Sequence, residues 1–433
     1  MSVFRGKNMA YKIINGMATC GLLCFVLINN LPAEEMLTWD TCVEETTIHN
    51  PELFSAREKI IQKEADRKIA VSGLLPYVST DFTGSQRHTD TGGTTKGYSY
   101  GISGRQLVFD GFKTTNDIKA ASRSLSAIQY NYAVVSSNIR LDLGTAFAEL
   151  LRAQKLIKIT EDIAERRRQN YGLVKLRYEG GREHRGSLMT ADADLAQAEL
   201  EVAEAGRNIH LSQRRLNKVL GREIYVPVLV EGDFDDYDRA AGQPDFEFMA
   251  YNNPLIRELI AREEAAQYSL QSSKSAFFPT VYLGADASRS DSDKIDDSDE
   301  WSVRAAVSLP LFEGGSRFAG VTKAKAVLDQ ARADEQSGRD DIIFQMEDTW
   351  IKYHNAQDAV SVKLKYLQAT EERAKISRAQ YSAGLVSFDN WIIIEDDLVK
   401  AKKAYLNAQA EVLVREAYWI QAKGGTLEYE NEE

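Results

Sequence analysis

Residues 301–315, WSVRAAVSLPLFEGG, contain the transition that decides the fold. Apolar side chains occupy every second position from Trp301 to Leu311, and mostly small or polar residues lie between them. A two-residue period with one apolar face predicts a half-buried β-strand. The glycines at its end precede residues 316–382, which contain no proline and therefore predict a long uninterrupted helix. The chain is expected to pass from strand to helix at Gly314 and Gly315.

The same transition occurs earlier in the chain at a fixed distance. Phe109-Asp110-Gly111 lies 203 residues before Phe312-Glu313-Gly314. Solenoid modules run about 20–50 residues, so an offset this long indicates duplication of one large structural half. Further pairs share the offset: Asn50-Pro51 with Asn253-Pro254, Pro76 with Pro279, Gln154 with Gln357, Tyr178 with Tyr381, Gly181 with Gly384, and Leu195 with Leu398.

Each half predicts a helix, two strands, a long helix and a returning helix. The strands are expected at about 77–87 and 97–109, and at about 280–289 and 300–312. The polar segments 87–96 and 290–300 between them are expected to be long outer loops. The alternation fits either a soluble hairpin on a core or strands of an outer-membrane barrel, and the long polar connectors favour the barrel.

The long helix is the second unusual feature. At 1.5 Å per residue, residues 316–382 span about 100 Å, far more than a globular domain needs. Apolar residues including Met346, Trp350 and Tyr353 follow heptad-like spacings, which by themselves indicate packing only. Turns at 178–181 and 381–384 lead into returning helices at about 187–220 and 387–422. The sequence thus predicts two long helical hairpins pointing away from the strands.

The first 33 residues have the layout of a secretory signal peptide. Arg5, Lys7 and Lys12 precede an apolar stretch from about 13 to 28, and Ala33 supplies a small residue for cleavage. A short N-terminal membrane helix is the alternative. Cys20 and Cys24 fall within this segment in a context that fits lipidation poorly. The remaining chain has one cysteine and hence no disulfide framework.

Charge and motif content exclude several classes of protein. Without the three early basic residues, 50 Lys and Arg stand against 64 Asp and Glu, a net charge of −14 that argues against nucleic-acid binding. The five histidines lack metal-ligand spacing, and no P-loop or G-x-S-x-G is present. Acidic pairs such as Asp192 and Asp194 are expected to be solvated. We therefore expect no enzymatic activity, cofactor or metal.

A membrane crossing would have to use the strands. No segment after residue 33 reaches the roughly 18 uninterrupted apolar residues that a spanning helix needs. Four strands cannot close, and an open edge in lipid leaves backbone groups unpaired at several kcal/mol each. Since the smallest natural outer-membrane barrels have about eight strands, closure demands at least two chains. Three chains would give twelve strands, but the argument leaves the number open.

These patterns divide the chain into five segments. They are the signal peptide (1–33), a first structural repeat (34–220), a linker or equatorial region with some local structure (221–252), a second repeat (253–425) and a C-terminal tail (426–433).

Three motifs and the duplication give the chain a resemblance to the TolC family of outer-membrane efflux proteins over nearly its whole mature length. The motifs are Leu37-Thr38-Trp39-Asp40 followed by Asn50-Pro51, then the segment 309–315 (LPLFEGG), then 380–384 (QYSAG). The resemblance implies an α+β membrane protein that forms a homotrimer. Its twelve-stranded barrel would lie in the outer membrane and continue into a periplasmic helical tunnel of coiled-coil hairpins.

The resemblance also implies partners and a mode of action. A periplasmic adaptor and an inner-membrane pump, of the RND or ABC type, would open the closed tunnel. The protein would be a passive duct for efflux or type I secretion. A non-pore periplasmic coiled-coil bridging protein remains an alternative, but it does not explain two alternating strand pairs with aromatic faces. A periplasmic adaptor is a third possibility, but adaptors usually carry one helical hairpin with lipoyl-like and barrel domains, not a duplication of hairpin and strands at an offset of 203 residues.

Candidate functional residues come from the same resemblance and lie at the hairpin turns. Tyr381 matches a tyrosine of the constriction, while Val386 stands where a basic partner is expected. Asn390 and Ile393 occupy the usual acidic slots beside Asp389, so a cation-attracting ring is only partly matched. The other turn offers alternative charges at Arg182, Glu183, His184 and Arg185. Adaptor docking is expected at Arg177, Tyr178, Gly181, Gly384, Leu385 and Ser387. A solvated helix turn is the alternative for all of these residues.

Overall fold

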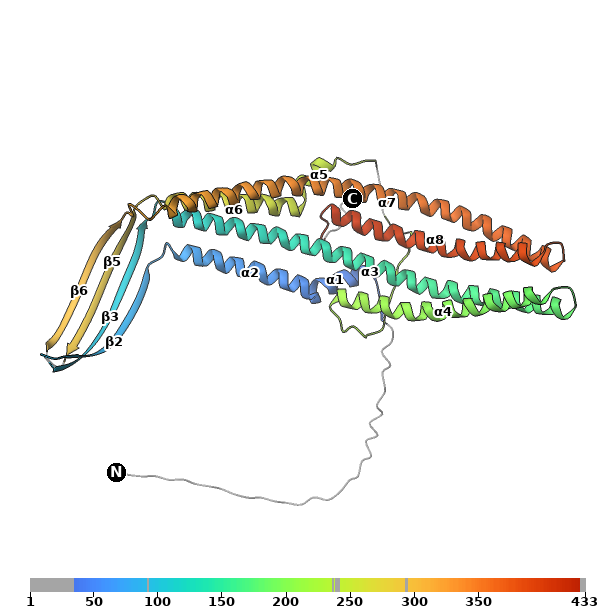
Figure 1. The fold of residues 1–433 in the computed structure, drawn as a ribbon, viewed down its shortest axis with the longest axis horizontal. Coiled ribbons are helices and arrows are strands. Elements are labelled where there is room, and N and C mark those ends of the chain that lie inside the picture. The colour runs from blue at the N-terminus through green and yellow to red at the C-terminus, as the bar shows by residue number, and fades with distance from the viewer. Residues whose placement is uncertain (1–34, 92, 236, 238–241, 293–294, 429–433) are drawn as a thin grey trace, which may run out of the picture.

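The computed structural model describes residues 35–428, except 92, 236, 238–241 and 293–294. The predicted signal peptide lies outside the described residues. The molecule is elongated, with a four-stranded sheet at one end and the turns of two helical hairpins at the other (Figure 1). No helix in the described ranges is long and apolar enough to cross a membrane.

The elements of the first half recur 203 residues later. Helix α2 (Pro51–Ser72) corresponds to α6 (Pro254–Ser275), and the long α3 (Lys113–Glu179) to α7 (Ser316–Ser382). Both long helices have 67 residues, as the sequence predicts for the second. The other elements are β1 (Glu35–Leu37), α1 (Trp39–His49), β2 (Tyr77–Thr89), β3 (Gly93–Phe109), α4 (Arg185–Leu220), β4 (Val228–Val230), α5 (Phe246–Asn252), β5 (Thr280–Ser292), β6 (Ile295–Ser308) and α8 (Phe388–Ala422).

The repeated Asn-Pro dipeptide begins α2 and α6 and ties each to its hairpin. Asn50 Oδ1 accepts hydrogen bonds from two backbone N–H groups of the first turn of α2, and Asn253 Oδ1 accepts one from α6. Proline suits the first helical position, where its missing N–H is not needed. The Asn50 amide donates to the Val219 carbonyl (2.8 Å), and the Asn253 amide to the Ala422 carbonyl (2.9 Å). Each returning helix therefore ends against the start of its own half.

The sheet has the antiparallel order β2-β3-β5-β6 and one apolar face. The register pairs Phe82 with Tyr100, Ile102 with Ala287, and Ala285 with Val303, so the predicted apolar residues share a face. Phe82 is 73% exposed and Val303 70% exposed. Polar pairs occupy the opposite face, including Ser79 with Ser103 and Asp286 with Ser302 and Arg304. The predicted alternation is confirmed.

The prediction of long outer loops at 87–96 and 290–300 is wrong. Strand β2 runs to Thr89 and β3 begins at Gly93, while β5 runs to Ser292 and β6 begins at Ile295. The polar side chains pair across the strands: His88 with Thr94 (3.1 Å), and Ser290 with Ser298 (2.8 Å). Cross-strand polar pairs stabilise a ladder as apolar pairs do, so polarity alone does not end a strand.

The strand expected at 300–312 is also displaced. Strand β6 ends at Ser308, before Leu309 and Pro310. Proline has no N–H to donate to the ladder. In the first half, the corresponding position is Leu107, and β3 continues to Phe109 with a register shift there.

Among the described residues, five apolar clusters hold the helices together, and three of them are the largest. One surrounds the middle of α3 and includes Leu143, Leu150 and Leu216, and short β1 and β4 pair in parallel beside it. A second joins α5, α6, α7 and α8 around Met346, Tyr353 and Trp419. The linker region 221–252 thus contributes β4 and α5 to the cores. The third cluster lies at the hairpin turns and belongs to the candidate site.

Candidate functional site

The candidate site lies at the two hairpin turns, at the end of the molecule remote from the sheet (Figure 1). Each turn contains a glycine with positive φ, Gly181 at 68° and Gly384 at 77°. Residues with a Cβ rarely adopt this conformation. After each glycine, a backbone hydrogen bond caps the C-terminal turn of the long helix. The Arg182 N–H donates to the Arg177 carbonyl, and the Leu385 N–H donates to the Gln380 carbonyl, both at 2.8 Å.

The returning helices begin with side-chain caps. The His184 imidazole accepts the Ser187 N–H at 3.1 Å, and the Ser387 hydroxyl accepts the Asn390 N–H at 3.4 Å. These caps satisfy backbone donors of the first helical turn. The structure gives His184 and Ser387 a role in setting the turn geometry.

Tyr381 is fully buried between the hairpins. Its ring stacks on Trp391 of α8, with centroids 4.2 Å apart and an interplanar angle of 11°. Phe388 packs edge-on against both rings. Val174 of α3 and Ala191 of α4 complete this cluster, which we call the tip core. The tip core therefore contains side chains from both hairpins.

Polar contacts from the first hairpin fix the position of the Tyr381 side chain and backbone. The Tyr381 hydroxyl donates to Glu183 Oε2 at 2.9 Å. Arg177 Nη1 donates to the Tyr381 carbonyl at 2.8 Å, and its guanidinium lies 4.6 Å from the Tyr381 ring centroid. We call Arg177, Glu183 and Tyr381 the tip lock, because these contacts run from the first hairpin to the second.

The electrostatics keep the tip lock in one protonation state at neutral pH. Partial burial raises the pKa of Glu183, but hydrogen bonds from Tyr381, Ser187 and the His184 backbone outweigh it and hold the pKa below its usual value. Burial, reinforced by the Glu183 carboxylate, raises the pKa of the Tyr381 hydroxyl above its ordinary range. Glu183 is thus an ionised acceptor and Tyr381 a neutral donor.

The other candidate residues lie on the surface of the same end. Arg182, Arg185, Asp389 and Asn390 are exposed and do not enter the tip core. Among the predicted docking residues, Leu385 is 77% exposed and Tyr178 is 38% exposed. Gly181, Gly384 and Ser387 are also exposed. Arg177 differs from them because it contacts Tyr381.

Sequence reasoning missed Trp391 and the position of Arg177. The signal for Trp391 is its place in the apolar series Phe388, Trp391, Leu398, which faces the core of the hairpin. Nothing in the sequence indicates that Arg177 covers the Tyr381 ring, because the contact joins residues 204 apart. Among the described residues, no group of three or more His, Cys, Asp or Glu side chains is arranged to hold a metal ion.

The sequence of the chain matches a known protein family and individual members of it. The profile of the family described as outer membrane efflux protein matches residues 42–222 and 249–425. The chain is similar to outer membrane efflux protein BepC of Brucella suis biovar 1, with 21% identity over 384 residues covering 87% of this chain and 83% of BepC. It is also similar to cation efflux system protein CusC of Escherichia coli O6:H1, with 20% identity over 399 residues covering 89% and 85% of the two chains.

Solved structures share the fold. A structure of CusC aligns with a TM-score of 0.82 at 18% identity, covering 89% of this chain and 91% of that chain. The Campylobacter jejuni CmeC outer membrane channel aligns with a TM-score of 0.82 at 16% identity, covering 91% and 86%. The long hairpins, the sheet and their connection are therefore features that this chain has in common with these proteins.

Proposed function

The chain belongs to the outer membrane efflux protein family, and from that membership we propose that three copies form a channel-tunnel that carries substrates out of the cell. The protein is an outer-membrane channel of an efflux system that extends into the periplasm. In the proposed assembly, each chain contributes four strands to a twelve-stranded barrel and two hairpins to the tunnel. An adaptor and an inner-membrane pump supply the substrate and the energy, and the duct itself is passive.

The observation that carries the proposal is the unfinished sheet. Its apolar face is exposed, with Trp301 and Val307 at 79% and 70%. Within the described part of the chain, the outer edges of β2 and β6 pair with no further strand. An unpaired edge in lipid costs several kcal/mol per backbone group. Pairing β6 of one copy with β2 of the next removes every edge once the ring closes.

The duplicated halves support the same assembly. We propose that residues 34–220 and 253–425 act as two quasi-equivalent repeats. Three chains then present six similar hairpins around one axis, and the region 221–252 forms a girdle around the middle of the tunnel. The 67-residue helices extend the duct about 100 Å from the sheet.

At the far end, the tip lock is the proposed closing contact. Tyr381, Glu183 and Arg177 hold the second hairpin against the first, and parting the hairpins widens the end of the tunnel. The exposed Arg182, Arg185, Asp389 and Asn390 surround this opening and contribute its charge. Tyr178, Gly181, Gly384, Leu385 and Ser387 form the surface on which a periplasmic adaptor docks, and Arg177 links that surface to the tip lock.

The experiment that tests the assembly is the native mass of the mature protein in mild detergent, corrected for bound detergent. Three chain masses, together with stepwise conductance in planar lipid bilayers, are expected. A monomer that stays soluble without detergent would refute the pore and favour a coiled-coil bridging protein. A dimer or tetramer would refute the twelve-strand closure while keeping a closed barrel.

A further inference from the structure

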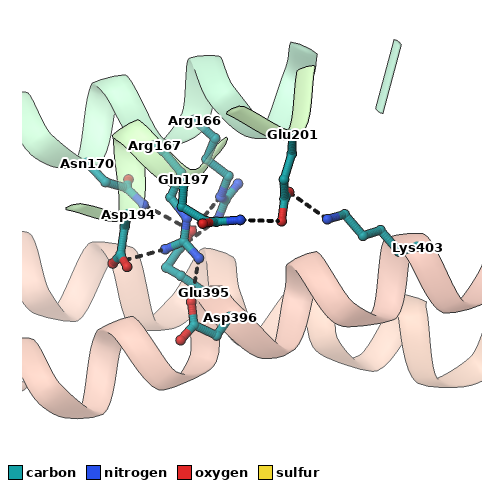
Figure 2. Close-up of polar contacts among 9 residues, drawn as sticks. All are labelled: Arg166, Arg167, Asn170, Asp194, Gln197, Glu201, Glu395, Asp396 and Lys403. Carbon is teal, nitrogen blue, oxygen red and sulfur yellow. Dashed lines mark hydrogen bonds and ion pairs between the residues drawn. The ribbon is translucent and has the colours of Figure 1, made fainter. Parts of the chain in front are cut away.

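A second polar cluster joins the two hairpins farther from the turns. Arg166 of α3 forms two hydrogen bonds with Glu395 of α8, Nε to Oε2 at 2.6 Å and Nη2 to Oε1 at 2.8 Å. Asn170 donates to Glu395 Oε2 at 3.2 Å. Figure 2 shows Arg166 and Asn170 directed from α3 toward Glu395, with the neighbouring Arg167 between Asp194 and Asp396.

The Glu395 side of this cluster is buried, unlike most ion pairs of the protein, while the Arg166 side chain is 27% exposed. Glu395 is only 2% exposed, and Asn170 is 2% exposed. Burial raises the pKa of Glu395, but the hydrogen bonds and charge of Arg166, with Asn170 and Arg167, outweigh it and keep the pKa below its usual value. An ionised carboxylate with this little solvent depends on its cationic partner.

The cluster lies one helical turn behind the tip core. Asn170, Ser377 and Glu395 are each four residues from a tip-core or tip-lock member, namely Val174, Tyr381 and Trp391. Residues four apart lie on the same helix face. A polar layer from α3, α7 and α8 therefore follows the aromatic layer, and the tip core separates it from the solvent at the turns.

The shortest ion pairs around this layer run between hairpins, whereas Arg167 and Asp194 pair within the first one. Arg166 and Glu395 belong to different hairpins, as do Arg167 and Asp396. By contrast, the exposed pair Arg373 and Asp397, at 3.6 Å, joins α7 to α8 within the second hairpin. Only the ion pairs between different hairpins have to break if the hairpins separate.

The layer is also incompletely satisfied. Among the described residues, Asn170 Oδ1 and Ser377 Oγ are buried without a hydrogen-bond partner. A buried polar atom without a partner raises the free energy of the closed arrangement. Parting the hairpins would hydrate these atoms, so the contact combines a strong ion pair with groups that favour release.

We propose that Arg166, Asn170 and Glu395 form a second lock, a positioning contact that must break before the periplasmic end of the channel can open. The proposal rests on the proposed channel function. It adds a buried ionic step to the tip lock. Releasing the tip lock exposes the polar layer to water, which weakens the Arg166–Glu395 attraction and lets the hairpins separate. Opening then proceeds from the turns inward.

The test is the conductance of purified Glu395→Gln protein in planar lipid bilayers without any partner protein. The substitution keeps the side-chain size and removes the charge. We expect open probability to rise at least about tenfold, because the buried pair contributes far more to the closed state than to a hydrated open one. Asp397→Asn is the matched control on the same helix, and it should change open probability less than about twofold because its ion pair is exposed.

The outcomes separate the second lock from the channel itself. A lower melting temperature with unchanged conductance would mean that Glu395 is merely structural, and it would overturn the proposal. If Glu395→Gln does not assemble, the Glu395→Asp variant is measured instead, because it keeps the charge but loses the two-point contact with Arg166. An unchanged open probability of that variant overturns the second lock.

The Tyr381→Phe variant is measured in the same assay. If it opens the channel and the Glu395 variants do not, the second lock is wrong and the channel stands. If no variant and no wild-type protein conducts, the channel function itself fails.

Discussion

The tip lock makes its sharpest prediction at a single oxygen atom. Tyr381→Phe removes the hydroxyl that donates to Glu183 at 2.9 Å and leaves the ring stacked on Trp391. The phenylalanine ring fills the same buried volume, so no cavity forms in the tip core. Glu183 retains the Ser187 hydroxyl at 2.9 Å and the His184 N–H at 3.3 Å. The substitution therefore removes one contact between hairpins and little else.

The size of the effect follows from the charge on the acceptor. A hydrogen bond to a charged group contributes about 1.5–3 kcal/mol. The closed arrangement loses this contribution, whereas an open one, with Glu183 in water, does not. At about 1.4 kcal/mol per factor of ten, the opening equilibrium should shift toward the open state roughly 10- to 100-fold.

Single-channel recording of the purified protein in planar bilayers measures this shift as open probability. The duplication provides the control, because Tyr178 occupies the equivalent position of the first half and is 38% exposed. Tyr178→Phe should leave partner-free open probability within about twofold of the wild type. If Tyr381→Phe also stays within twofold while Tyr178→Phe does the same, the Tyr381–Glu183 contact does not hold the channel closed.

Three further predictions concern stability and membrane insertion. Gly384→Ala should lower the melting temperature because a Cβ at φ 77° costs about 1–2 kcal/mol; Gly206→Ala, in open space on α4, should raise it. Val303→Lys, on the apolar sheet face, should reduce the yield of the proposed trimer from membranes at a cost of about 2–4 kcal/mol per chain, whereas Ser302→Lys on the opposite face should not. Burial, with a contribution from Asp396 and against Arg167, raises the pKa of Asp194. Because the pKa of Asp194 is higher in the folded than in the unfolded protein, the folded protein loses stability as the pH rises from the unfolded pKa through the folded pKa. By calorimetry, the Asp194→Asn protein should therefore have a higher melting temperature than the wild type at pH 7 and the same melting temperature at pH 3.

The helices could be predicted closely because the duplication supplied two independent readings of each. The absence of proline, with Gly314-Gly315 before the helix and Gly384 after it, placed α7 at about 316–382, which agrees with the structure. The strand ends were harder. A polar run such as 290–300 is compatible with a loop or with a paired polar ladder, and cross-strand partners such as Ser290 with Ser298 decide between them. Those partners are known only once the register is known.

The site was predicted only in part, for a related reason. The resemblance selected Tyr381, and the charged turn suggested Glu183, but their pairing joins two hairpins whose relative rotation the sequence does not give. Asp194 was expected to be solvated and is instead half-buried opposite Arg167 at 3.9 Å. Glu395 left a visible signal that went unused: it occupies a slot between Trp391 and Leu398 in an otherwise apolar series. A carboxylate in a core position calls for a buried cation.

The different surroundings of the two equivalent tyrosines explain how a duplicated chain makes an asymmetric contact between its hairpins. The backbone of the turns is conserved between halves, because Gly181 and Gly384 keep the same positive φ. The side chains after it have diverged. The first turn carries Glu183, which accepts from Tyr381, while the equivalent position of the second turn is Val386 and offers Tyr178 no acceptor. One tyrosine is therefore buried between the hairpins and the other remains on the surface. Replacing Val386 with Glu should leave the contact between Tyr381 and Glu183 unchanged, because Glu183 on the first hairpin would still accept the Tyr381 hydroxyl.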